Sequence, residues 1–295
     1  MKKSYIYAVI SVLVWSTNAP TVKVLLGGIP SMQALFLSSA FAFLFMASVN
    51  LFGGGWRKAK EFSLRQYGMM AALGFVGLFV YSALYYFGLT QLTAQEGCIL
   101  NYLWPLMLVL FSCLFMGEKL TPLKVGALLS SFLGIVILSA GGGGKAGGNA
   151  LLGMASCIGG AVCYGLFSAL NKKAAFDQNI CMSVVWLITA VCSLIAGLMT
   201  ETWVPMTGGQ WMGMLWLGVV VDGLAYLLWA LSLEGAANTA AIANLAYLTP
   251  FLAVIVSAVF LKEGFQPRAL IALVFIVGGI LVQSLFDRAT PRRRQ

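Results

Sequence analysis

Two short stretches of this apolar chain each combine an asparagine, aromatic side chains and a proline. The first contains Asn101, Tyr102, Trp104 and Pro105, and the second contains Asn244, Tyr247, Thr249 and Pro250. Amide and hydroxyl groups can hold the amino and carboxylate groups of a solute, while aromatic faces supply apolar contact. Proline removes one helical hydrogen bond and kinks the helix. Each stretch therefore predicts a bent helix that lines a binding site, with the two prolines as candidate gating positions.

Further aromatic and polar side chains recur three or four positions apart within apolar runs, so each group shares one helical face. These candidate substrate-binding residues are Trp15 and Asn18, Tyr81 and Tyr85, Tyr164 and Ser168, and Tyr226 and Trp229. Packing between helices is the alternative explanation for every one of them. Together with the two proline stretches, they predict a cavity with aromatic walls.

Two acids are candidates for coupling or gating. Asp222 lies eleven residues past Trp211, in the middle of an apolar run. An acid at such a depth costs roughly 2.5–3.5 kcal/mol. It predicts a group that titrates or attracts a cation, with hydrogen-bonded packing as the alternative. Glu96 lies nearer the end of its run, so we expect it to be partly solvated, with a gating role as the alternative.

Composition places the chain in lipid. Of its 295 residues, 60% are hydrophobic and 9% are charged, and the mean hydropathy is +0.92. Soluble proteins are roughly 25% charged. Ten apolar runs approach the ~20 residues that cross a bilayer. They cover residues 4–26, 31–52, 67–89, 93–116, 122–140, 150–171, 180–200, 211–232, 237–260 and 267–286.

The two halves of the chain repeat each other at a fixed offset of 145 residues, which places 81–139 on 226–284 without a gap. The matched pairs include Tyr81 and Tyr226, Tyr102 and Tyr247, Pro105 and Pro250, Pro122 and Pro267, and Gly134 and Gly279. Five spans in each half is an odd number, so the second copy enters the bilayer upside down. We therefore expect an all-α polytopic membrane protein with ten transmembrane helices arranged as two inverted five-helix repeats.

Charge sets the expected orientation. With the N-terminus inside, fourteen lysines and arginines flank the inner ends of the spans and three flank the outer ends. This bias predicts that both termini are cytoplasmic, and it explains the net charge of +9 without nucleic-acid binding. The expected segments are residues 1–140 for the first five-helix repeat, 141–149 for a short periplasmic linker, 150–288 for the second, inverted repeat, and 289–295 for a basic cytoplasmic tail.

The sequence contains few of the residues that catalysis or metal binding requires. The chain has no histidine, and its six cysteines form no C-x-x-C pair. No metal site, cofactor or enzymatic activity is expected. A channel is also disfavoured, because no selectivity ring or repeated polar stripe is present. The expected class is a carrier, a monomer or weak homodimer, whose partners are the lipid bilayer and a small-molecule substrate.

The run from Ala83 to Leu89, followed by the run from Asn101 to Pro105, resembles the bacterial aromatic amino acid exporter branch of the drug/metabolite transporter superfamily. The segments 15–17 and 248–250, with Glu263, fit the wider superfamily. The resemblance implies a bacterial inner-membrane exporter of aromatic or other apolar amino acids. It also implies alternating access through a central cavity formed mainly by spans 1, 3, 4, 6, 8 and 9. Other small amphipathic metabolites or drugs are the alternative cargo.

Cysteine labelling tests the inverted repeat. Lys145→Cys should react with a membrane-impermeant thiol reagent applied outside the cell, because the linker between the halves is expected there. Lys58→Cys should react only after the membrane is permeabilised. The reverse labelling pattern would contradict the topology.

Overall fold

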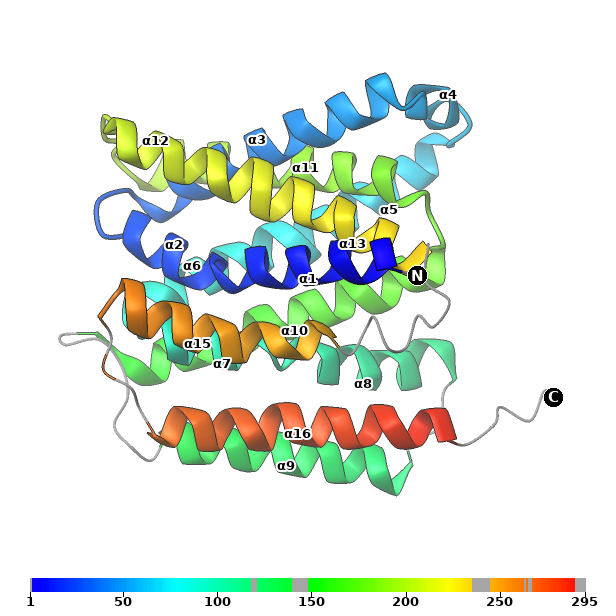
Figure 1. Cartoon of the computed structure of the whole chain (residues 1–295). Coiled ribbons are helices and arrows are strands. Elements are labelled where there is room, and N and C mark those ends of the chain that lie inside the picture. Colours follow the sequence, from blue (N-terminus) through cyan, green and yellow to red (C-terminus); the bar gives the residue numbers. More distant parts are fainter. Residues whose placement is uncertain are drawn as a thin grey trace.

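The chain forms a bundle of helices in the computed structural model, which describes residues 2–117, 121–139, 148–234, 245–262, 264 and 267–289. Every regular element in these residues is helical (Figure 1). Asn244, Lys145 and most of the predicted linker lie outside the described residues.

The helical elements follow the same order in the two halves. Those of the first half are α1 (Lys2–Ser16), α2 (Asn18–Leu25), α3 (Ser31–Phe52), α4 (Gly55–Ala59), α5 (Leu64–Gly74), η1 (Phe75–Val80), α6 (Tyr81–Gln91), α7 (Ala94–Asn101), α8 (Trp104–Met116) and α9 (Pro122–Ser139). Those of the second half are α10 (Ala150–Ala174), α11 (Gln178–Thr200), α12 (Gly208–Leu215), η2 (Trp216–Leu224), α13 (Ala225–Glu234), η3 (Ala246–Leu248), α15 (Thr249–Phe260) and α16 (Pro267–Ala289).

Seven helical stretches of the described chain are long and apolar enough to cross a membrane. They are Lys3–Leu25, Ser31–Phe52, Leu64–Gln91, Ala94–Met116, Ala150–Ala174, Gln178–Thr200 and Gly208–Leu233. Three shorter apolar helices are Val125–Leu138, Ala246–Phe260 and Pro267–Gly279. Each predicted run overlaps one of these stretches, so the all-helical membrane fold is confirmed, whereas the number of crossings stays a prediction.

Helices of one half pack on helices of the other in matching pairs. α1 packs on α13, and its counterpart α10 packs on α6. α3 packs on α11, and α9 packs on α16. In Figure 1, α9 and α16 lie side by side along one edge of the bundle. Residues of the first two pairs, α1–α13 and α10–α6, line the cavity described below.

Repeat-equivalent residues meet each other between α9 and α16. The Ser130 hydroxyl donates to the Phe275 carbonyl at 2.7 Å, and the Ser131 hydroxyl to the Ile276 carbonyl at 3.4 Å. The 145-residue offset assigns Phe275 to Ser130 and Ile276 to Ser131. Residues therefore contact their own counterparts at the centre of this interface.

Away from that centre, residues of α9 and α16 no longer contact their own repeat counterparts. The contacts occur instead in reciprocal pairs. A Cβ added at Gly134 would lie 2.8 Å from the Ala272 carbonyl oxygen, and one added at Gly279 would lie 3.1 Å from the Ala127 carbonyl oxygen. The offset equates Gly134 with Gly279 and Ala127 with Ala272. Reciprocal contacts of this kind mark a two-fold relation. Because a residue before the centre meets one after it, the two helices are antiparallel.

Each half also contains one long segment with a π-helical stretch, η1 in the first half and η2 in the second. The offset maps η1 onto 220–225, which overlaps η2. A Cβ added at Gly77 of η1 would lie 2.3 Å from the Cβ of Phe167 in α10, so only glycine permits this approach. π-Helical turns are rare and often occur at functional sites.

The two predicted kinks lie at equivalent helix starts. Pro105 is the second residue of α8, and Pro250 is the second residue of α15. Neither proline has an N–H, so the carbonyls four residues earlier, on Asn101 and Ala246, lose their helical donor. The Tyr102 hydroxyl donates to the Ala246 carbonyl at 3.3 Å. This bond joins the kinks of the two halves.

A double-mutant cycle tests this compensation. Tyr102→Phe should reduce stability by about 0.5–1.5 kcal/mol, because the Ala246 carbonyl then keeps only its bond from the Thr249 N–H. In a Pro250→Ala background the new backbone N–H can donate to the same carbonyl, so Tyr102→Phe should cost less. Thermal unfolding of the four proteins in detergent measures both costs. Equal costs in the two backgrounds would count against the assignment.

Glycine substitutions test the close approach of α9 and α16. Gly134→Ala should destabilise the protein by about 1–3 kcal/mol, because the new methyl group meets backbone. Gly126→Ala in the same helix is the matched control, since a Cβ there meets no atom within 4 Å. It should be neutral or slightly stabilising in thermal unfolding. Similar losses for both variants would rule out the packing described.

Candidate functional site

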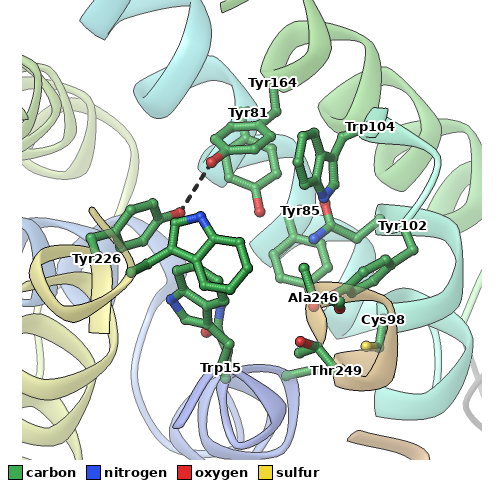
Figure 2. Close-up of a pocket in the computed structure, with 14 residues that line it drawn as sticks. Trp15, Tyr81, Tyr85, Cys98, Tyr102, Trp104, Tyr164, Tyr226, Ala246 and Thr249 are labelled. Carbon is green, nitrogen blue, oxygen red and sulfur yellow. Dashed lines mark hydrogen bonds between the residues drawn. The ribbon is translucent and has the colours of Figure 1, made fainter. Parts of the chain in front are cut away.

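One cavity of about 170 Å³ is enclosed by side chains from six of the predicted spans (Figure 2). Its lining residues are Trp15, Asn18, Ala19, Tyr81, Tyr85, Cys98, Asn101, Tyr102, Trp104, Tyr164, Tyr226, Trp229, Ala246 and Thr249. Ten of the predicted substrate-binding residues are among them. The structure thus brings together side chains that lie more than two hundred positions apart in the sequence.

Aromatic rings from α1 and α13 form one side of the cavity. The ring of Trp15 lies 5.1 Å from that of Tyr226 at an interplanar angle of 65°. It lies 5.3 Å from the ring of Trp229. These separations are typical of edge-to-face and tilted aromatic pairs, which hold one another in fixed orientations. We call these three residues the Trp15 wall.

A second group of rings faces them from α6, α8 and α10. The ring of Tyr164 lies 4.9 Å from that of Tyr81 and 5.2 Å from that of Trp104. Tyr81 also stacks on Tyr85 at 6.0 Å. We call these four residues the Tyr164 wall. The hydroxyls of Tyr164 and Tyr226 lie 3.2 Å apart and link the two walls (Figure 2).

Three polar atoms on lining residues are buried and have no hydrogen-bond partner in the described part of the chain. They are Trp15 Nε1, Asn101 Oδ1 and Thr249 Oγ1. Asn101 lies beside Tyr81 and Thr249 beside Tyr102, but Asn101 Oδ1 and Thr249 Oγ1 form no hydrogen bond with these tyrosines. Buried polar groups are normally satisfied, and an unsatisfied one costs roughly 1–3 kcal/mol. The three atoms therefore keep unused hydrogen-bonding capacity on side chains that line the cavity.

The remaining candidates occupy other places. Besides Asp222 and Glu96, those that the structure describes but that do not line the cavity are Ser168, Tyr247, Pro105 and Pro250. Ser168 donates its hydroxyl to the Tyr164 carbonyl, 2.7 Å away and one turn earlier in α10. The two prolines are buried. Asn244 lies outside the described residues.

Asp222 is half-buried within η2 and does not line the cavity. It lies within electrostatic range of the hydroxyls of Tyr81, Tyr86, Tyr164 and Tyr226. Three of these tyrosines also line the cavity. Asp222 is therefore a neighbour of three cavity-lining tyrosines, although it does not line the cavity itself.

Glu96 occupies a helix cap. Its side chain accepts from the backbone N–H of Thr93 at 3.1 Å, and the Thr93 hydroxyl accepts from the Glu96 N–H at 3.2 Å. It also lies 3.8 Å from Arg268 of α16. The expectation that Glu96 is partly solvated is wrong, since only 1% of it is exposed. The capping box and the cation replace the water that the carboxylate would otherwise need.

Sequence reasoning missed three lining residues, Ala19, Cys98 and Ala246, and it named Thr249 only as a member of the second proline stretch. Small residues such as alanine produce no recognisable periodicity in the sequence. Two other features could have identified Thr249 and Cys98. The offset equates Thr249 with Trp104. Cys98 lies three positions before Asn101, on the same helical face.

The groups that line the cavity are suited to binding a solute. The cavity provides aromatic faces, hydroxyls, an indole N–H and an amide. The described residues contain no group of three or more histidine, cysteine, aspartate or glutamate side chains that could hold a metal ion.

Known proteins with similar sequences are transporters. The chain is 28% identical to an aromatic amino acid exporter, YddG, of Ancylobacter novellus, over 94% of this chain and 96% of that one. It is 24% identical to a probable terminal-alkyne amino-acid exporter of Streptantibioticus cattleyicolor, over 97% of this chain and 94% of that one. One solved crystal structure shares the fold, with a TM-score of 0.71, 23% identity, and coverage of 98% of this chain and 99% of that one.

The family relationship extends over both halves. The model of the EamA-like transporter family matches residues 2–140 and again residues 151–285. With its apolar helices, this makes the protein a multi-pass membrane transporter rather than an enzyme. The chain belongs to the EamA-like transporter family.

Proposed function

We propose that this protein exports amino acids with aromatic or other apolar side chains across the bacterial plasma membrane, by alternating access through the cavity. The observation that carries the proposal is the combination of two aromatic walls with three unpartnered polar atoms. A flat side chain gains apolar contact between the walls. Trp15 Nε1 and the Thr249 hydroxyl can donate to a carboxylate, and Asn101 Oδ1 can accept from an ammonium group.

The size of the cavity limits the cargo. Its volume of about 170 Å³ is below the roughly 300–1,000 Å³ of sites for drug-sized ligands. A single amino acid suits this space better than a multi-ring drug. The volume therefore favours amino acids over the larger amphipathic solutes considered from the sequence.

The two named relatives support an amino acid cargo. One is described as an exporter of aromatic amino acids and the other as a probable exporter of an amino acid that carries a terminal alkyne. Their cargoes share the amino acid group and differ in the side chain. In the present chain, the three unpartnered atoms suit the shared group, and the aromatic walls suit the variable one.

The arrangement of helices supports a common side for the two termini and an alternating-access cycle. The start of α1 and the end of α16 lie at the same end of the bundle (Figure 1). This agrees with two cytoplasmic termini, as the charge bias predicts. Inverted repeats with broken helices at mid-membrane are the usual construction of alternating-access carriers.

Counterflow in proteoliposomes tests the function. Labelled phenylalanine should enter vesicles preloaded with unlabelled phenylalanine, and tryptophan and leucine should compete while glutamate and lysine should not. Trp104→Ala should raise the KM for phenylalanine by about tenfold, since an aromatic contact contributes roughly 1.5 kcal/mol beyond burial.

Trp211→Ala is the matched control for Trp104→Ala. Trp211 packs on Phe41 outside the cavity and is 44% exposed, so its loss should leave the KM unchanged. Unchanged flux in Trp104→Ala at normal protein abundance would reduce the Tyr164 wall to a packing role. Absence of phenylalanine counterflow in the wild-type protein would reject the proposed function.

A further inference from the structure

Asp222 differs from the other acids whose surroundings the structure describes inside or beside the spans. Glu96 accepts from the Thr93 N–H and lies beside Arg268. Glu201 accepts from the backbone N–H groups of Met32 and Gln33 at the start of α3. Among the described residues, no group donates a hydrogen bond to Asp222 and no cation pairs with it.

Asp177 shows how this chain normally accommodates an acid. It caps α11 by accepting from the N–H groups of Asn179 and Ile180, and it pairs with Lys58 at 3.0 Å. Partial burial raises the pKa of this carboxyl, but the Lys58 cation and the two N–H groups outweigh it and hold the pKa below its usual range. The contrast makes the lack of partners at Asp222 unusual for this chain.

The side chains that interact electrostatically with Asp222 are tyrosines, and none of them is a cation. α6 contributes Tyr81 and Tyr86, α10 contributes Tyr164, and α13 contributes Tyr226. α3 and α12 contain no ionisable residue. The charged residues of the other neighbouring elements are Lys2 and Lys3 at the start of α1, Lys23 of α2, which donates to the Leu89 and Leu92 carbonyls, and Glu234 at the end of α13.

A carboxylate in such surroundings needs a counter-ion, because an isolated charge is not stable in a low-dielectric interior. The described chain supplies none, so the counter-ion has to come from solution. Two cations can neutralise the carboxylate of Asp222: a proton that binds to it, and the ammonium group of a solute in the neighbouring cavity. Tyr81, Tyr164 and Tyr226, which we call the tyrosine layer, interact electrostatically with Asp222 and also line the cavity.

We propose that Asp222 is neutralised by a proton when the cavity is empty and by the ammonium group of the substrate, acting across the tyrosine layer, when the cavity is filled. This proposal rests on the proposed function and deepens it. Substrate binding releases the proton from the Asp222 carboxyl, and substrate release allows another proton to bind. With binding on the cytoplasmic side and release outside, each exported amino acid exchanges for one entering proton.

Proton movement in proteoliposomes tests the exchange, with phenylalanine as the probe and the membrane potential held at zero. A pH-sensitive dye inside the vesicles should report one proton leaving for each phenylalanine that enters. A gradient of one pH unit should support up to about tenfold accumulation of phenylalanine. Asp222→Asn should move no protons and show no response to the gradient. It should still perform counterflow, at a higher KM, since exchange between loaded carriers needs no titration.

Two further variants sharpen the test. Asp177→Asn is the matched control, because it removes a carboxyl outside the cavity while asparagine still caps the helix. It should behave like the wild type. Asp222→Glu keeps the carboxyl and should keep proton movement, and it decides the question if Asp222→Asn does not fold.

The outcomes separate the two claims. Wild-type protein with counterflow but without proton movement would overturn the role of Asp222 and leave the proposed function intact. So would normal proton movement in Asp222→Asn, a folded Asp222→Asn without counterflow, or a folded, active Asp222→Glu without proton movement. Absence of counterflow in the wild type would instead reject the proposed function.

Discussion

A helix in lipid has to satisfy its backbone hydrogen bonds within the protein, and a proline inside a span removes one of them. Pro105 and Pro250 impose this constraint at equivalent positions of the two halves. At the second kink the Ala246 carbonyl accepts from the Thr249 N–H and, across the halves, from the Tyr102 hydroxyl. Irregular backbone at membrane depth is tolerated only against protein or a water-filled space. The kinks therefore lie where the cavity is, and the walls are arranged around them.

The two-fold relation explains the scaffold, and the departures from it explain the chemistry. The offset of 145 residues equates Trp104 with Thr249, Asn101 with Ala246, and Gly77 with Asp222. Each pair combines a large, amide or acidic side chain with a small or hydroxylated one. A symmetric backbone thus surrounds an asymmetric cavity, and an amino acid, with different groups at its two ends, needs such asymmetry.

The sequence was sufficient for the parts of the site that depend on period and repetition. Asn101, Tyr102 and Trp104 could be selected because a proline and a repeated copy mark them. Ser168 was selected on the same periodicity, but its hydroxyl bonds to its own helix, which spacing alone does not reveal. The π-helical stretches were not predicted, because they depend on how α3, α10 and α11 press on two glycine-containing segments. The burial of Glu96 was missed although Thr93 and Glu96 have the spacing of a capping box.

The central claim is that one cavity holds both charged groups of an amino acid as well as its side chain. Equilibrium titration of the purified protein with phenylalanine, phenethylamine and 3-phenylpropionate tests it most directly. The three compounds share the ring, and the last two each lack one charged group. The account predicts that phenylalanine binds at least about tenfold more tightly than either analogue, since each lost pairing is worth roughly 1.5–3 kcal/mol. Equal affinities for all three would contradict it.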